Sequence, residues 1–209
     1  MEYVYLNKEV IYSNIRNLSQ VTFEVTDACN LQCKYCGYGE LYDGYDTRKS
    51  KMLSLEQAYP LLEYLYAHWQ QSDSYRKKTY ISFYGGEPLL NMDFIRGIVG
   101  WIMNHQIPQC DFVFTMTTNG MLLDRYIDYL VEHEFKILVS LDGNKENNGY
   151  RVDFSGRPSF DRVFANVKFV QQYYPDFFRK NVEFNSVLHN LNDYQDIIPF
   201  FQKEPLSHI

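Results

Sequence analysis

The sequence predicts an α/β domain built on a parallel sheet or barrel. From Gln20 onward, short runs with the character of β-strands alternate with longer stretches of helical periodicity, which is the pattern of consecutive βα units. The chain has 209 residues, 45% hydrophobic and 22% charged, so it can bury one sizeable core. The predicted strands are residues 21–26, 79–84, 112–117, 136–141 and 182–187.

Residues 1–19 predict an extension that precedes the barrel, which we place at residues 20–209. Tyr3, Tyr5 and residues 10–12 have the alternating character of short β-strands. We therefore expect this extension to form a short hairpin that packs on the bottom of the barrel.

A helix is predicted between the first two strands. Ser54 and Gln57 have the spacing of a capping box, and apolar residues follow them at helical intervals. Pro60 falls inside this helix, which allows either a kink or a later helix start. The apolar positions are Leu55, Ala58, Leu61, Leu62, Leu65 and Trp69.

Three further helices are predicted at residues 92–104, 124–134 and 160–174, each with an apolar stripe that faces the core. Two connections, residues 37–53 and 142–159, are longer than such a fold requires. Both contain several glycines, and long loops of this kind usually carry function or are mobile.

Charge and hydropathy exclude several classes of partner. The net charge is −6 and the pI is about 5.4, so the chain lacks the basic surface that a nucleic-acid partner requires. The longest apolar stretch, residues 98–103, is too short to cross a membrane, and residues 1–5 do not begin a signal peptide. We therefore expect a cytoplasmic protein that binds neither nucleic acid nor membranes.

Three of the four cysteines form a cluster directly after the first predicted strand. Cys29, Cys33 and Cys36 lie close together, whereas Cys110 is far downstream and is predicted to be a core or loop thiol. Such clustering favours metal ligation in a reducing compartment over a disulfide framework. Three thiolates can bind three irons of a [4Fe–4S] cluster, which leaves one iron open for a substrate or cofactor.

Two other interpretations of the cluster remain open. Zinc would need a fourth cysteine or histidine, and the five histidines are all distant in the sequence, although folding can bring one close. Three thiols with a purely structural role would place three reactive side chains in one polar loop.

With these residues in view, the chain resembles the radical S-adenosylmethionine (SAM) enzymes over roughly residues 20–204. Their CxxxCxxC motif carries an aromatic residue before the third cysteine, here Tyr35. The second strand runs into Gly85-Gly86-Glu87-Pro88, which is similar to the family's GGEP segment. The resemblance implies that this segment meets the methionine amine of SAM, because glycines permit close backbone approach and a carboxylate can hold an ammonium. A strand-to-helix turn that stops at Pro88 is the alternative.

Later strand ends resemble the subgroup of radical SAM enzymes that carries a C-terminal SPASM domain. The resemblance implies that Ser140, with Asn119 and Asn185 as further candidates, faces the ribose or carboxylate of SAM or the substrate. Asn119 is equally well explained as a left-handed turn residue before Gly120. Arg151 is either a clamp for a carboxylate of the cofactor or of a peptide substrate, or a solvated arginine.

The resemblance therefore implies a partial TIM-like barrel of the radical SAM type and an activity like that of anaerobic sulfatase maturases. Such an enzyme cleaves SAM reductively to methionine and a 5′-deoxyadenosyl radical, which modifies a peptide or protein substrate. It needs a reducing electron donor such as flavodoxin or ferredoxin. A competing hypothesis from another class is a binding module that holds the cluster, SAM or a peptide without turnover.

The sequence departs from this family in its length. The family's partial barrel has six βα units followed by the SPASM domain, whereas this sequence ends after the fifth predicted strand and a short helix. We therefore expect a barrel truncated after about five units, with an open edge that favours self-association or a partner.

Overall fold

A computed structural model describes residues 7–38, 48–72, 77–203 and 206. Its centre is a sheet of five parallel strands in the order β1-β2-β3-β4-β5, so each strand pairs with the next one along the chain. The predicted α/β class and parallel topology are confirmed. The strands are β1 (Gln20–Thr26), β2 (Lys77–Gly85), β3 (Cys110–Thr118), β4 (Lys136–Ser140) and β5 (Val182–Asn185).

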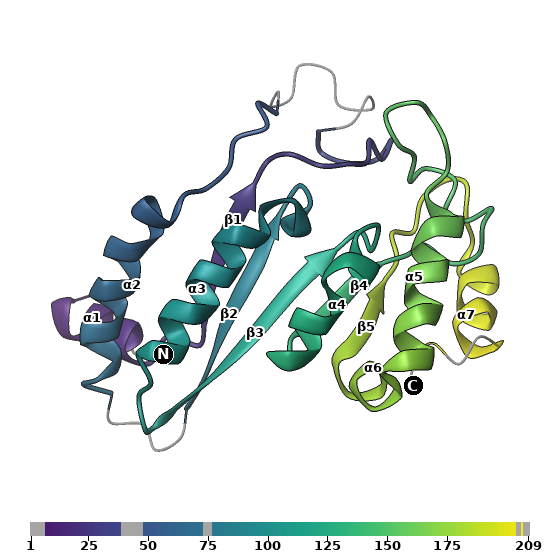
Figure 1. The fold of residues 1–209 in the computed structure, drawn as a ribbon. Coiled ribbons are helices and arrows are strands. Elements are labelled where there is room, and N and C mark those ends of the chain that lie inside the picture. Colours follow the sequence, from purple (N-terminus) through teal and green to yellow (C-terminus); the bar gives the residue numbers. More distant parts are fainter. Residues whose placement is uncertain (1–6, 39–47, 73–76, 204–205, 207–209) are drawn as a thin grey trace, which may run out of the picture.

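The helices follow one another along the sheet in chain order, and the loops at the carboxyl ends of the strands gather at one end of the molecule (Figure 1). The helices are α1 (Lys8–Arg16), α2 (Leu55–Trp69), α3 (Met92–Asn104), α4 (Leu123–Glu132), α5 (Phe160–Tyr173), α6 (Pro175–Asn181) and α7 (Tyr194–Lys203), with a 3-10 turn η1 (Pro88–Asn91) before α3. Among the described residues, none of these helices is long and apolar enough to cross a bilayer.

The predicted N-terminal hairpin is wrong: residues 8–16 form helix α1. The Asn7 side chain caps it by accepting a hydrogen bond from the Val10 amide at 2.9 Å. Glu9 in the first turn and Arg16 in the last complement the helix dipole, and these terminal signals outweigh the short β-like alternation. Tyr3 and Tyr5 lie outside the described residues.

Helix α2 confirms the predicted capping box. Ser54 Oγ accepts from the Gln57 amide at 3.3 Å, and Gln57 Oε1 accepts from the Ser54 amide at 3.1 Å. The helix continues through Pro60 without a later start. The prediction that Leu61 faces the core is wrong, because this side chain is 46% exposed.

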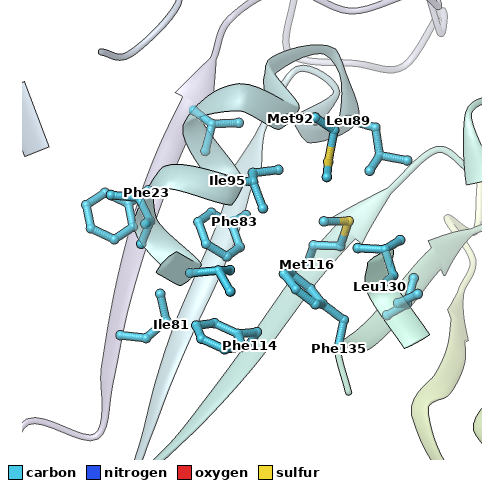
Figure 2. Packing of buried hydrophobic residues seen from close by; sticks show 14 of the residues in the cluster. Phe23, Ile81, Phe83, Leu89, Met92, Ile95, Phe114, Met116, Leu130 and Phe135 are labelled. Carbon is cyan, nitrogen blue, oxygen red and sulfur yellow. The ribbon is translucent and has the colours of Figure 1, made fainter. Parts of the chain in front are cut away.

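The hydrophobic core lies between the sheet and the helices that cover it (Figure 2). Along β1, Val21, Phe23 and Val25 are buried, whereas Thr22 and Glu24 are exposed, as the period of a strand requires. Cys110 is buried at the start of β3, as predicted for a core thiol. The core residues labelled in Figure 2 are Phe23, Ile81, Phe83, Leu89, Met92, Ile95, Phe114, Met116, Leu130 and Phe135.

The opposite face of the sheet is polar. Gln20 Nε2 donates to Ser82 Oγ at 2.9 Å, and Ser82 Oγ lies 2.7 Å from Thr115 Oγ1, so hydroxyl and amide groups connect β1, β2 and β3. These side chains border a cavity of about 320 Å³. The apolar core therefore occupies one side of the sheet, and hydrogen-bonded polar side chains of β1, β2 and β3 lie on the other.

Candidate functional site

The carboxyl ends of β1 to β4 border a cavity of about 490 Å³, which lies where parallel α/β folds place their sites. Most of the residues predicted to form the site line this cavity, although they come from separate parts of the sequence. Those that line it are Cys29, Cys33, Tyr35, Cys36, Gly85, Gly86, Asn119, Ser140 and Arg151. Glu87 and Asn185 are not among the lining residues.

The cysteine loop, residues 29–36, is held in place by a buried leucine and by hydrogen bonds within the loop. Leu31 is fully buried, and its amide lies 3.4 Å from Cys29 Sγ. The Cys36 amide donates to the Cys33 carbonyl at 3.1 Å, which turns the chain so that the third cysteine faces the same cavity as the first two.

The three cysteines are partly buried thiols that do not form disulfides. Burial raises the pKa of Cys29 and raises that of Cys33 to about 11, while the Arg151 charge opposes the shift at Cys33. Thiolates are the form that binds metal, so metal binding must displace protons at these positions.

The donor set fits an iron–sulfur cluster better than zinc. Within the described ranges, no group of three or more Cys, His, Asp or Glu side chains is arranged around a point where one metal ion could sit. In a [4Fe–4S] cluster each cysteine binds a different iron, so the thiols must border a common space rather than meet at one point. The described cavity wall contains three cysteines and neither a histidine nor a fourth cysteine.

Gly85 and Gly86 allow the end of β2 to approach the start of the cysteine loop. The Gly86 amide donates to the Thr26 carbonyl at 2.8 Å, and the Glu87 amide donates to the Ala28 carbonyl at 2.8 Å. A Cβ atom at Gly85, where φ is +131°, would lie 2.2 Å from the Thr26 oxygen, and one at Gly86 would lie 2.1 Å from the Ala28 oxygen. The glycines are therefore required for contact between two backbone segments that border the cavity.

Glu87 does not present its carboxylate to the cavity, which corrects the predicted contact with the amine of SAM. The side chain is fully buried and accepts hydrogen bonds from Thr118 Oγ1 and the Asn119 amide at 2.7 Å each, and from the Leu89 amide at 3.1 Å. Burial raises the pKa of Glu87, and these donors oppose that shift. Glu87 thus joins the ends of β2 and β3 and caps the 3-10 turn η1.

We expect Glu87→Gln to lower the free energy of unfolding by about 1–3 kcal/mol, because the amide group would place a donor opposite other donors. Urea unfolding monitored by circular dichroism measures this loss. The control is Glu146→Gln at an exposed position, for which we expect little change. Equal stability of the two variants would contradict the assigned role of Glu87.

Asn119 bridges the end of β3 and the cysteine loop. Its Nδ2 donates to Asn30 Oδ1 at 2.7 Å and lies 3.6 Å from Cys29 Sγ, while its Oδ1 accepts from the Met121 amide at 3.0 Å. The left-handed conformation belongs to Gly120, at φ +78°, and not to Asn119. The interpretation of Asn119 as a left-handed turn residue is therefore wrong.

Ser140 and Asn185 are paired in the register of β4 and β5, but only Ser140 lines the cavity. Asn185 Oδ1 is buried and has no hydrogen-bond partner in the described part of the chain. Ser140 thus occupies the predicted position at the strand end, whereas Asn185 lies outside the cavity wall.

Arg151 is not a solvated arginine: it lines the cavity and pairs with a buried carboxylate. It is 7% exposed, and it binds the buried Asp142 carboxylate through Nε at 3.1 Å and Nη2 at 3.2 Å. The Tyr35 hydroxyl donates to the same carboxylate at 2.5 Å. Burial is the main cause that raises the pKa of Tyr35, so the hydroxyl stays protonated and acts as the donor. The sequence places Asp142 at a strand end, but we predicted no role for it.

Arg48 is a second arginine on the cavity wall, and it was not predicted from the sequence. Its guanidinium carbon lies 5.0 Å from the centre of the Tyr38 ring, and no carboxylate among the described residues pairs with it. Arg48 lies within the connection of residues 37–53 and belongs to no motif that the sequence analysis singled out. Of these two arginines on the described cavity wall, Arg151 is paired with a carboxylate and Arg48 is not.

Comparison with known proteins decides the family. The family model described as "Radical SAM superfamily" matches residues 23–202 of the chain. The chain belongs to the radical SAM superfamily. The predicted family is therefore confirmed, and family membership implies SAM and a [4Fe–4S] cluster as cofactors.

This radical SAM domain is similar to sulfatase-maturating enzymes. It is 25% identical to the "Cysteine-type anaerobic sulfatase-maturating enzyme" of Clostridium novyi (strain NT) over 197 residues, which cover 91% of this chain and 49% of the relative. The solved structure "Native anSMEcpe with bound AdoMet" matches with a TM-score of 0.71 at 22% identity, over 90% of this chain and 49% of that chain.

A further solved structure, "Native anSMEcpe with bound AdoMet and Kp18Cys peptide", matches with a TM-score of 0.69 at 20% identity. It also covers 90% of this chain and 49% of that chain. These structures agree with the partial radical SAM barrel predicted here. The chain spans about half the length of the relatives that it matches.

Proposed function

We propose that this radical SAM domain holds a [4Fe–4S] cluster on Cys29, Cys33 and Cys36 and cleaves SAM to modify a peptide or protein. The observation that carries the proposal is that all three thiols line one cavity together with the glycine-rich end of β2. When bound, the cluster supplies the electron that cleaves the sulfonium of SAM to methionine and a 5′-deoxyadenosyl radical.

The chain's own residues bind and orient SAM in this proposal. The backbone at Gly85 and Gly86 faces the methionine amine, and Ser140 at the end of β4 accepts or donates a hydrogen bond to the ribose. The Tyr35 ring forms an aromatic wall beside the third cysteine. Asn119 contributes by holding the cysteine loop, and Asn185 would need to reorient in order to reach the ribose.

Arg48 is proposed to bind the carboxylate of SAM, since the guanidinium of Arg151 is paired with Asp142. We expect Arg48→Gln to weaken SAM binding about 10- to 100-fold, which is the usual cost of one charge-assisted hydrogen bond. Equilibrium binding of SAM to the reconstituted protein measures this change. Arg157→Gln, on an exposed arginine paired with Asp153 outside the cavity wall, is the control and should bind SAM normally. Normal binding by both variants would contradict the role of Arg48.

A polypeptide substrate is supported by the relatives: one is named a sulfatase-maturating enzyme, and a solved neighbour holds a peptide. A flavodoxin or ferredoxin is proposed as the electron donor. The edge of β5 that is not paired in the described sheet is proposed to accept a partner strand or a second copy, because unpaired strand groups favour such pairing.

The proposal is tested by anaerobic reconstitution with iron and sulfide, followed by reduction in the presence of SAM. We expect about four irons per chain and the formation of 5′-deoxyadenosine, since three cysteines support one cluster. Eight irons, or stoichiometric zinc after native purification, would overturn the cluster assignment. Binding of the cluster and SAM without 5′-deoxyadenosine would favour the binding-module hypothesis.

A further inference from the structure

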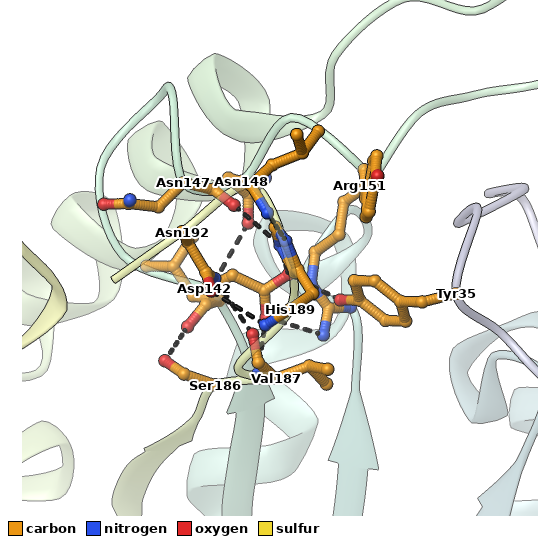
Figure 3. A network of polar contacts seen from close by, with 12 residues as sticks. Tyr35, Asp142, Asn147, Asn148, Arg151, Ser186, Val187, His189 and Asn192 are labelled. Atoms are coloured by element: carbon orange, nitrogen blue, oxygen red, sulfur yellow. Dashed lines mark hydrogen bonds and ion pairs between the residues drawn. The ribbon is translucent and has the colours of Figure 1, made fainter. Parts of the chain in front are cut away.

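A fully buried carboxylate, Asp142, follows β4 at the start of its long connection (Figure 3). Its Oδ2 accepts from Tyr35 Oη at 2.5 Å and from Arg151 Nε at 3.1 Å. Its Oδ1 accepts from Arg151 Nη2 at 3.2 Å and from the Val187 amide at 3.0 Å. Four donors thus occupy the four acceptor positions of the carboxylate. We call Asp142, Tyr35, Arg151 and Val187 the Asp142 junction.

The Asp142 junction joins three segments that are distant in the sequence. Tyr35 belongs to the cysteine loop, 107 residues before Asp142, and Val187 follows β5, 45 residues after it. Arg151 belongs to the connection between β4 and α5. The carboxylate is therefore the point at which the cysteine loop meets the ends of β4 and β5.

Two backbone hydrogen bonds reinforce this contact. The Gln32 amide donates to the Val152 carbonyl at 2.7 Å, and the Lys34 amide donates to the Tyr150 carbonyl at 3.0 Å. Both acceptors flank Arg151, so the position of the arginine and the position of the cysteine loop are linked.

Aromatic contacts surround the same point. The centre of the Tyr35 ring lies 6.1 Å from that of Tyr150 and 5.5 Å from that of His189, and the Arg151 guanidinium carbon lies 5.4 Å from it. His189 Nε2 is 4.0 Å from Asp142 Oδ2 and contacts the Asn147 carbonyl at 3.1 Å. The hydroxyl bond to Asp142 thus fixes a ring that packs on three neighbours.

The charges at the junction are balanced. Arg151 and Asp142 are both buried, and each would be an uncompensated buried charge without the other. Both act electrostatically on Cys33, the arginine favouring the thiolate and the aspartate opposing it. The Asp153–Arg157 pair of the same connection, in which the arginine is exposed, does not line the cavity.

We propose that Asp142 is a positioning residue, which fixes the cysteine loop through Tyr35 and balances the charge of Arg151 beside the cavity. The role toward the cavity's ligand rests on the proposed function, whereas the role in positioning the loop does not. An asparagine at this site could not replace the carboxylate, because its NH₂ group would oppose either the donors on Oδ2 or those on Oδ1.

The loop-positioning role is tested on the metal-free protein by amide hydrogen exchange. In Asp142→Asn we expect faster exchange at the Gln32 and Lys34 amides, and in Tyr35→Phe, which keeps the ring but removes the hydroxyl, a smaller increase at the same amides. Asp161→Asn, at an exposed carboxylate paired with Lys145, is the control and should exchange as the unmodified protein does. Unchanged exchange at both amides in Asp142→Asn would overturn the proposal.

The charge-balancing role is tested by redox titration of the reconstituted cluster, followed by electron paramagnetic resonance. A negative charge near the cluster disfavours reduction, so Asp142→Asn should raise the midpoint potential and Arg151→Gln should lower it. A merely structural role would not give shifts of opposite sign. Shifts in the same direction would overturn charge balancing. If the unmodified protein takes up no iron, the proposed function fails, and hydrogen exchange still decides whether Asp142 positions the loop.

Discussion

Replacing Cys33 by Ala is expected to abolish iron uptake, lowering the content after reconstitution from about four to below about one iron per chain. Cys33 is the middle cysteine of the loop and lines the cavity together with Cys29 and Cys36. A cluster held by only two thiolates would have two open irons and would be labile. Iron analysis and the visible absorption spectrum measure the loss, and the formation of 5′-deoxyadenosine should stop with it.

Cys110→Ala is the matched control, since it removes a thiol that does not line the cavity. Cys110 Sγ donates to Thr79 Oγ1 at 3.3 Å in the core. This variant should keep its iron and lose about 1 kcal/mol of stability. Full iron content in Cys33→Ala, or loss of iron in Cys110→Ala, would contradict the assignment of the cluster to the cysteine loop.

Gly86→Ala is expected to cost about 3 kcal/mol of stability and to abolish SAM binding, because the added methyl group cannot be accommodated without a backbone shift. The new Cβ would lie 2.1 Å from the Ala28 carbonyl oxygen, which is a rigid backbone atom. The shift would separate the end of β2 from the start of the cysteine loop. Urea unfolding and SAM binding measure the two effects.

Gly100→Ala is the control for Gly86→Ala, because this glycine has room for a methyl group. Gly100 lies within α3, and nothing is within 4 Å of a Cβ built there. Alanine should stabilise this helix by up to about 1 kcal/mol, since it has the higher helix propensity. Similar losses of stability in both glycine variants would argue against a specific contact at Gly86.

The strands and most of the site could be predicted because local patterns determine them. Short β-like runs between stretches of helical periodicity located all five strands, and a parallel sheet brings its strand ends together, so residues such as Gly85, Asn119 and Ser140 reach one cavity. The motif placed the three cysteines at the first strand end. These features depend on spacing along the chain rather than on side-chain direction.

The side-chain roles that were missed depend on which polar groups form hydrogen bonds and ion pairs in the folded structure. Sequence spacing cannot reveal that the Glu87 carboxylate turns toward Thr118 and Asn119 instead of the cavity. In the same way, the sequence left Arg151 as either a carboxylate clamp or a solvated arginine, because spacing does not reveal that it is buried against Asp142. Helix α1 was missed because its Asn7 cap was overlooked beside short β-like runs.

The sequential order of the strands in the sheet has a consequence for how the protein folds. Because every strand pairs with its neighbour in sequence, the sheet can assemble one βα unit at a time as the chain leaves the ribosome, and each step closes only a modest loop. The bond between Tyr35 and Asp142 is different, since it spans 107 residues and must wait for β4. We therefore expect a nascent chain that has formed β1 to β3 to present its cysteine loop unclosed. We expect iron to reach the cysteines more readily before Asp142 and the connection after β4 have bound the cysteine loop.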